Sequence, residues 1–237
     1  MEATGYTTLN RQTGLLREMQ TVANNIANST TTGYRAEGII FSEYVSRSEH
    51  APSLSMATAN IGQTSLVTGT LTQTGSELDV AIQGDGFFLV ETPSGERLSR
   101  AGSFSLSSEG DLVTHDGFRV LDTGGAPIFI PPDVTSLGVS ADGTLSAGNR
   151  LLGQLGVVMP ENPDDLIREG GVMFRVDGAF DAVAQPQVRQ GFLEGSNVNP
   201  VNEMTRMIEV QRAYEMGQSF LDAEDNRIRE VIKTLTR

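Results

Sequence analysis

Cysteine and tryptophan are absent from this 237-residue sequence, and it holds only two histidines. Without cysteine there can be no disulfide, no thiol nucleophile and no cysteine-ligated metal. The same absence suits a protein that enters an oxidising compartment. His50 and His115 both lie in polar, turn-like sequence, so we expect them to be exposed rather than to bind a metal. No metal ligand and no cofactor-binding residue is predicted.

Basic residues are also scarce: 17 Lys and Arg stand against 30 Asp and Glu, a formal net charge of −13. This balance argues against nucleic acid or an anionic membrane surface as the main partner. No run of about 18 apolar residues is present, so no membrane span is predicted. The first residues lack the basic start and apolar core of a cleaved signal peptide, so export would need another route.

Catalytic motifs are equally scarce. The Gly-Asp-Gly segment 84–86 is followed by two phenylalanines instead of a helix, which does not suit a phosphate-binding loop. Ser107, His115 and Asp116 supply the residue types of a hydrolase triad without its strand-turn-helix elbow. We therefore predict no catalytic residue and no enzyme. Paired carboxylates need not be close in sequence, so a periplasmic enzyme acting on cell-wall glycan stays open as an alternative, as does an adhesin-like binding module.

What the sequence does contain is a long helical pattern from Pro200 to Leu235, with Asn199 as its candidate N-cap. Its contact residues recur at alternating steps of three and four, the heptad pattern of a helix that packs along a partner helix. At about 1.5 Å per residue the helix is roughly 50 Å long, too long for a body of about 15 Å radius of gyration to cover. The predicted contact line is Met207, Val210, Tyr214, Gly217, Leu221, Glu224, Ile228, Val231 and Leu235.

Within that line we interpret Gly217 as a point of close approach between helices. A second apolar line runs beside the first: Met204, Ile208, Ala213, Met216 and Phe220. One partner helix can cover one line, which leaves the other for neighbouring copies of the chain. Contact with a different surface on the next copy generates a helical filament. The C-terminal helix is therefore predicted to be an assembly surface.

The N-terminal residues 3–28 give a second, weaker heptad pattern. Two interleaved lines define it: Leu9, Leu16 and Ala23, and Gln12, Met19 and Ile26. Its end is rich in amides that predict register-fixing hydrogen bonds: Asn24, Asn25 and Asn28. Because the chain leaves along this helix and returns along the C-terminal one, we predict that the two helices pair antiparallel.

Between the helices the sequence is β-like. Short apolar runs alternate with Asp-Gly, Gly-Gly and similar turn signals from about residue 78 to residue 188. The predicted class is α+β, with the terminal helices paired like a coiled coil and a central antiparallel domain like a barrel or sandwich. The predicted parts are an N-terminal helix (1–33), an extended connector with short strands (34–77), the β domain (78–188), and a strand, turn and long helix (189–237).

Three segments resemble one family, the axial proteins of the bacterial flagellar rod and hook. The run from Val22 to Tyr34 looks like its N-terminal signature, Ala-Asn-Asn-Ile-Ala-Asn followed by Thr-Gly-Tyr. Residues 78–88 with 100–104 are similar to its β motif, and residues 190–201 to the start of its C-terminal helix. Within the family, the segment 139–145 and the length are most like the proximal-rod branch, with the distal-rod branch as the close alternative.

The resemblance implies a non-catalytic structural subunit. It implies export, unfolded, through the flagellar type III apparatus without signal cleavage, and assembly as the periplasmic rod of the basal body. The implied partners are copies of the chain itself and other rod proteins, including the distal rod protein. Assembly would use the two terminal helices.

Overall fold

The computed structural model describes residues 2–46, 54–134 and 136–235. The chain divides into two compact units. One, the helix unit, is made of Met1–Ala27, Glu37–Gln63 and Asn199–Arg237, and the other, the β unit, of Asn28–Ala36 and Thr64–Val198. The chain therefore passes between the units four times, after residues 27, 36, 63 and 198.

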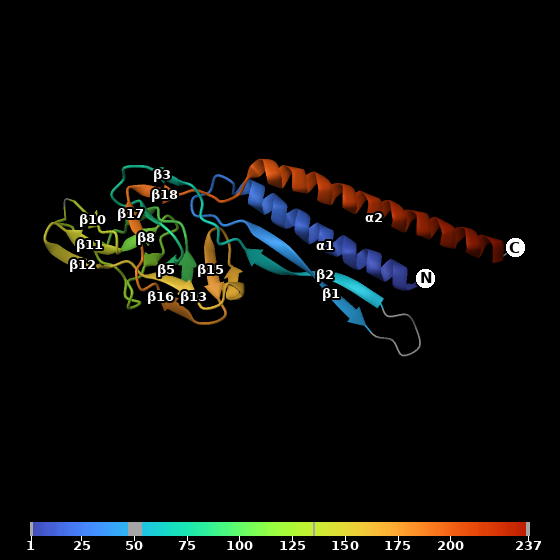
Figure 1. The fold of residues 1–237 in the computed structure, drawn as a ribbon, viewed down its shortest axis with the longest axis horizontal. Helices are drawn as coiled ribbons and strands as arrows, with labels where there is room; N and C mark the ends of the chain where they lie inside the picture. The colour runs from blue at the N-terminus through green and yellow to red at the C-terminus, as the bar shows by residue number, and fades with distance from the viewer. Residues whose placement is uncertain (1, 47–53, 135, 236–237) are drawn as a thin grey trace. The chain divides into compact units, whose positions relative to one another are not determined.

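The helix unit contains two long helices, α1 (Glu2–Ala27) and α2 (Pro200–Leu235) (Figure 1). They run antiparallel, because Gln12 of α1 bonds Tyr214 of α2 while Glu18 pairs with Arg206. The start of α2 is capped as its sequence predicts. The Asn199 side-chain oxygen accepts from the backbone N–H groups of the second and third helical residues, at 3.1 and 3.3 Å.

The same unit holds a two-stranded sheet, β1 (Glu37–Ser46) and β2 (Leu54–Thr64), whose first strand packs against α1. The sequence predicts only short strands within a connector here, whereas the structure has strands of 10 and 11 residues. Periodicity missed their length because the Ser-, Thr- and Ala-rich second strand has little apolar contrast, although Thr fits a pleated strand well.

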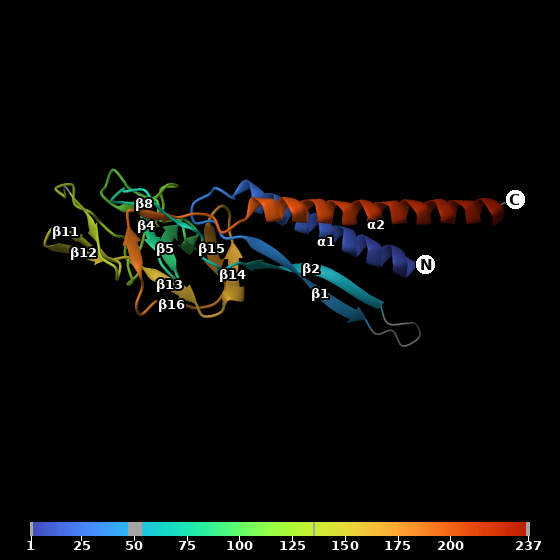
Figure 2. The ribbon, with the colours of Figure 1, turned by 45° about the horizontal axis from the view of Figure 1, so that its top comes forward.

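The β unit is built from short strands (Figure 2). Every register that is defined between them is antiparallel. Its largest sheet has the order β14-β15-β6-β5-β9-β8-β7, with β13 joining β5 and β16. The strands of that sheet are β5 (Phe87–Thr92), β6 (Gly95–Ser99), β7 (Phe104–Leu106), β8 (Leu112–Thr114), β9 (Arg119–Val120), β13 (Val157–Pro160), β14 (Leu166–Arg168), β15 (Met173–Val176) and β16 (Phe180–Ala182).

Smaller sheets complete the unit. One has three strands, β10 (Gly138–Val139), β11 (Thr144–Ala147) and β12 (Arg150–Gln154). Two strand pairs are formed by β17 (Val188–Gln190) with β4 (Val80–Ile82), and by β18 (Phe192–Glu194) with β3 (Leu71–Gln73). A short 3-10 helix, η1 (Pro163–Asp165), precedes β14. The α+β prediction is confirmed: an N-terminal helix, a mostly antiparallel β region and a C-terminal helix.

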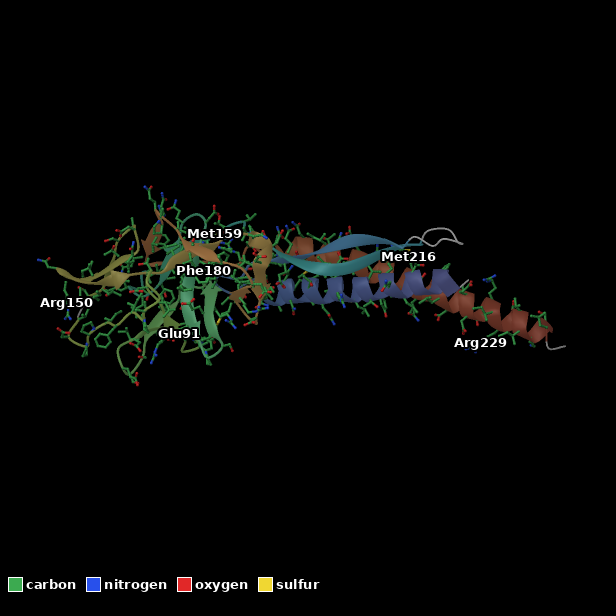
Figure 3. All side chains as sticks on the ribbon, turned by 90° about the horizontal axis from the view of Figure 1, so that it is seen from below. Glu91, Arg150, Met159, Phe180, Met216 and Arg229 are labelled. Carbon is green, nitrogen blue, oxygen red and sulfur yellow. The ribbon has the colours of Figure 1, made fainter. Side chains whose placement is uncertain are left out.

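The large sheet has two buried faces. Successive residues of a strand point to opposite faces, and Phe87 and Phe88 accordingly join different apolar clusters. Phe88 packs edge-on against Phe104, with ring centroids 5.2 Å apart, and Phe87 packs against Phe174 at 5.7 Å. Met159 and Phe180, labelled in Figure 3, are partly buried and pack against the second cluster. The continuous burial of residues 87–90 explains why this strand reads as one apolar run.

Gly102 marks a close approach inside the β unit. A Cβ added there would collide with the carbonyl group of Val80, whose own N–H donates to the Gly102 carbonyl at 2.9 Å. At Gly153 of β12, by contrast, an added Cβ would meet nothing within 4 Å.

We therefore expect Gly102→Ala to destabilise the β unit by about 2 kcal/mol or more, because the backbone must move to admit the methyl group. Gly153→Ala is the matched control and should change stability by less than about 0.5 kcal/mol. Thermal unfolding of the purified chain, followed by far-UV circular dichroism, measures both. Equal midpoints for the two variants would contradict the close approach.

Candidate assembly helices and a buried ion-pair junction

The predicted contact line of α2 faces α1 over most of its length. Val210 is buried, and Met207, Tyr214, Gly217, Leu221 and Glu224 are half-buried. The remaining residues of the line are exposed: Ile228 at 42%, Val231 at 49% and Leu235 at 80%. The line therefore continues, uncovered within this chain, along the last turns of the helix.

On α1 the buried line differs from the one that apolar periodicity suggests. Leu9 and Leu16 are exposed, at 53% and 43%, whereas Met19 and Ile26 are half-buried. Of the three amides, Asn24 is exposed, Asn28 half-buried and Asn25 buried. The residues that are buried at helical steps of three and four are Gln12, Leu15, Glu18, Val22 and Asn25.

Polar contacts explain that line. The Gln12 side-chain amide donates to the Tyr214 carbonyl at 2.9 Å, and Arg206 donates to the Glu18 carboxylate at 2.7 Å. Asn25 donates to the Glu37 carbonyl at 2.8 Å and accepts from its N–H at 3.0 Å. Such contacts fix helix register at a cost in stability. The partners of Gln12 and Glu18 lie about 200 and 190 residues away in sequence, so spacing alone could not have identified them.

At Gly217 the end of the Gln12 side chain lies close to the α2 backbone. A Cβ there would collide with the side-chain amide of Gln12. Beside it lies a groove of about 380 Å³, lined by Thr8, Arg11, Gln12, Leu15, Ala213, Met216, Gly217 and Phe220. Four residues of the second apolar line of α2 are exposed, Met204 at 54%, Ile208 at 51%, Met216 at 67% and Phe220 at 46%, whereas Ala213 is half-buried. Met216 is labelled in Figure 3.

The β unit contains a buried ion-pair cluster that the sequence analysis missed. The Glu194 carboxylate pairs with Arg35 at 2.9 Å and with Arg100 at 2.5 Å, and all three side chains are at most 2% exposed. Burial lowers the pKa of Arg35 to about 10, while Glu194 acts in the opposite direction. Arg35 therefore stays protonated at neutral pH.

Arg100 also binds the turn between β4 and β5. It donates to the carbonyl oxygens of Ile82, Gly84 and Gly86. Segment 84–86, whose sequence does not suit a phosphate-binding loop, thus directs its carbonyl groups toward an arginine. Gly84 and Gly86 both adopt positive φ, at 102° and 122°, which glycine accepts at little cost.

Arg168 joins the cluster to the core. It donates to the Arg35 carbonyl, and its guanidinium lies 4.4 Å from the Tyr34 ring centroid and 4.6 Å from that of Phe174. These distances are typical of cation–π contacts. The cluster is therefore anchored in the packed interior of the β unit.

Other candidate chemistry finds no support in the described residues. His115 is exposed, and His50 lies outside residues 2–46, 54–134 and 136–235. Within those ranges no group of three acidic or histidine side chains is placed to hold a metal ion. Neither of the two described α-helices combines the length and the apolar character needed to cross a membrane.

Family models match three parts of the chain in order. The flagella basal body rod protein model matches residues 6–35. The D1 domain model of the flagellar hook protein FlgE/F/G matches residues 81–147, and the C-terminal model of the flagellar basal body rod FlgEFG protein matches residues 189–234. The matches therefore include most of both helices and the strands from β5 to β11.

Full-length relatives agree with these matches. The chain is 37% identical to the flagellar basal-body rod protein FlgF of Mesorhizobium japonicum, over 99% of this chain and 98% of the relative. It is 37% identical to FlgF of Caulobacter vibrioides, over 97% and 96%. It is 33% identical to the flagellar basal-body rod protein FlgG of Bacillus subtilis, over 91% and 92%.

The Gly217 contact predicts that a substitution which usually stabilises a helix will not stabilise this one. Gly→Ala inside a helix ordinarily stabilises by about 1 kcal/mol. Here the methyl group should displace Gln12 from the Tyr214 carbonyl, so we expect Gly217→Ala to give no gain or a loss of about 1 kcal/mol. In a Gln12→Ala background the collision is absent, and the gain of about 1 kcal/mol should appear. Denaturant unfolding of the four proteins measures this cycle, and purely additive effects would contradict it.

Proposed function

The chain belongs to the family of flagellar hook and basal-body rod proteins, and we propose that it assembles through α1 and α2 into the axial rod. It is a structural subunit of the flagellar basal-body rod and not an enzyme. Its full-length similarity to FlgF proteins fits the proximal-rod branch rather than the distal-rod alternative. Family membership sets aside the cell-wall enzyme, and nothing in the described residues favours an adhesin-like module.

The observation that carries the assembly proposal is the uncovered apolar surface of α2. Met204, Ile208, Met216 and Phe220 remain about half exposed or more although α1 packs beside them. Full burial of one such side chain stabilises by about 1.5 to 3 kcal/mol. A neighbouring subunit that covers this line therefore gains enough to drive association, and contact between unlike surfaces extends into a filament.

We assign the assembly roles to the predicted helix residues on this basis. The second apolar line and the exposed end of the first, Ile228, Val231 and Leu235, would contact neighbouring subunits. On α1, the exposed Leu9 and Leu16 would do the same, whereas Asn25 holds its own chain together. The neighbours are copies of this chain and other rod and hook proteins, with the distal rod protein among them.

Several finer points belong to the same proposal. The helix pair would pack like a coiled coil, and the β region would be one domain of barrel or sandwich type. Residues 1–33, 34–77, 78–188 and 189–237 would act as the four parts of the chain. The subunit would leave the cytoplasm through the flagellar type III apparatus without signal cleavage and assemble in the periplasm. A sequence without cysteine supports that route.

Met216→Asp tests the assembly surface. Met216 is 67% exposed, so an aspartate should leave the monomer folded but place an unpaired charge in the proposed interface. We expect normal helix content and a loss of motility in cells that carry only this variant. Gln218→Asp adds the same charge at an exposed polar position and should support swimming. Normal amounts of the Met216→Asp chain in isolated basal bodies would contradict the assignment.

The two halves of the contact line should respond differently to charge. Leu221→Asp places a carboxylate against α1 and should destabilise the helix pair by about 1 to 3 kcal/mol. Ile228→Asp lies on the exposed part and should leave the monomer's unfolding unchanged while it prevents incorporation into the rod. Circular dichroism of the monomers and immunoblots of basal bodies measure the two effects. Equal destabilisation by both variants would show that the line is covered throughout.

A further inference from the structure

The four points at which the chain enters or leaves the β unit are joined by two residues, one of which uses its backbone carbonyl as well as its side chain. Those points are at Asn28, Ala36, Thr64 and Val198. Glu194 and Asn197, three residues apart just before α2, contact the segments next to all of them. We propose that Glu194 and Asn197 form a single junction. Through it, the four segments that connect the two units share mechanical force. The force-sharing part rests on the proposed rod function, whereas the existence of the junction does not.

Glu194 holds three segments through different atoms. Its carbonyl accepts from the Gly33 N–H at 2.8 Å, and its carboxylate accepts from the Gly69 N–H at 2.8 Å. The same carboxylate pairs with Arg35 and Arg100. Gly33 has a φ of 71°, and an added Cβ would collide with the backbone at residues 100–101, so its segment is seated closely. One buried residue thus ties the segments 28–36 and 64–70 to the strand that leads into α2.

Asn197, three residues later in the sequence, also joins several of these segments. Its oxygen accepts from the Ala36 N–H at 2.6 Å, and its nitrogen donates to the Val67 carbonyl at 2.8 Å. The Ala36 carbonyl in turn accepts from the Ser65 N–H at 2.8 Å. The exit at residue 36 and the re-entry at residue 64 are therefore bonded to each other and to the final exit at residue 198.

Shared attachment has a mechanical consequence. In a rotating rod, any force that the covalent chain carries between the two units must pass through these four passages. If each passage were held separately, the most heavily loaded one would detach first. Because buried charge-assisted bonds are strong and mutually dependent, the passages are expected to open together or not at all. The anchors at Arg100 and Arg168 transfer that force to the packed β unit.

Hydrogen exchange of the purified chain tests the junction without reference to the flagellum. We expect Glu194→Gln to speed exchange at Gly33, Ala36, Gly69 and Gly195 together, by at least tenfold, with the Leu89 amide in the core unchanged. The matched control is Glu169→Gln, which also removes a carboxylate that bridges two arginines, Arg97 and Arg175, but lies 37% exposed. This control should leave the exchange rates of the four amides unchanged. Faster exchange at Gly69 alone would overturn the single junction.

Asn197→Ala keeps the proposal testable if Glu194→Gln fails to fold. It removes no bond made by Gly33 or Gly69, since both bind Glu194. If the junction opens as one unit, these two amides should nevertheless exchange at least tenfold faster. Faster exchange at Ala36 only would show that the segments are held independently.

Swimming under rising viscosity tests the force-sharing part. In cells that lack the natural chain, the wild-type sequence should restore swimming; failure to do so would refute the rod function itself and leave the exchange results standing. Asn197→Ala should swim normally in dilute medium and lose speed at least twofold more steeply than Glu169→Gln as viscosity rises. Force sharing would be overturned if the swimming speeds of the two variants declined equally with viscosity. It would also be overturned if Asn197→Ala failed to swim at any viscosity.

Discussion

The buried carboxylate of Glu194, shared by two arginines, is the interaction on which the arrangement of the β unit depends. Removing three charges from water is costly, and one carboxylate cannot neutralise two guanidinium groups. The remaining positive charge is met by carbonyl groups: those of Ile82, Gly84 and Gly86 around Arg100, and those of Leu66 and Val67 around Arg35. Buried ion pairs of this kind favour one arrangement more than they add stability.

That specificity explains why glycines surround the cluster. An arginine can reach backbone carbonyls only where the chain turns tightly toward it, and Gly84 and Gly86 allow that turn with positive φ. Gly69 donates directly to the Glu194 carboxylate, and a Cβ there would collide with the Gly195 carbonyl. The charge cluster and the close backbone packing therefore require each other. A larger residue at any of these points would move a carbonyl or an amide away from the charge that it solvates.

Apolar periodicity and turn residues were enough to predict the outline of the fold. The bounds of α2 follow from Asn199, Pro200 and the heptad line, all of which are local signals. The contact line of α1 could not be predicted in the same way. Periodicity selects Leu9 and Leu16, which are exposed, together with Gln12, which is buried, and it misses Glu18. The partners of Gln12 and Glu18 lie about 190 to 200 residues away. The Arg35, Arg100 and Glu194 cluster was hidden for the same reason, although the family resemblance had marked the segments that contain Arg100 and Glu194 and one that ends at Tyr34.

The polar character of the helix pair bears on how the rod forms. Among the described side chains of α1 and α2, the buried apolar ones are Leu15, Val22 and Val210. Half-buried apolar side chains such as Met207 and Leu221 add to the contact, and the polar bonds set register but add little net stability. Such a pair is specific without being strongly stable, and any neighbour that binds its folded form stabilises it by mass action. If that neighbour covers the apolar surface left on α2, as we propose, completion of the helix unit and growth of the rod become one process.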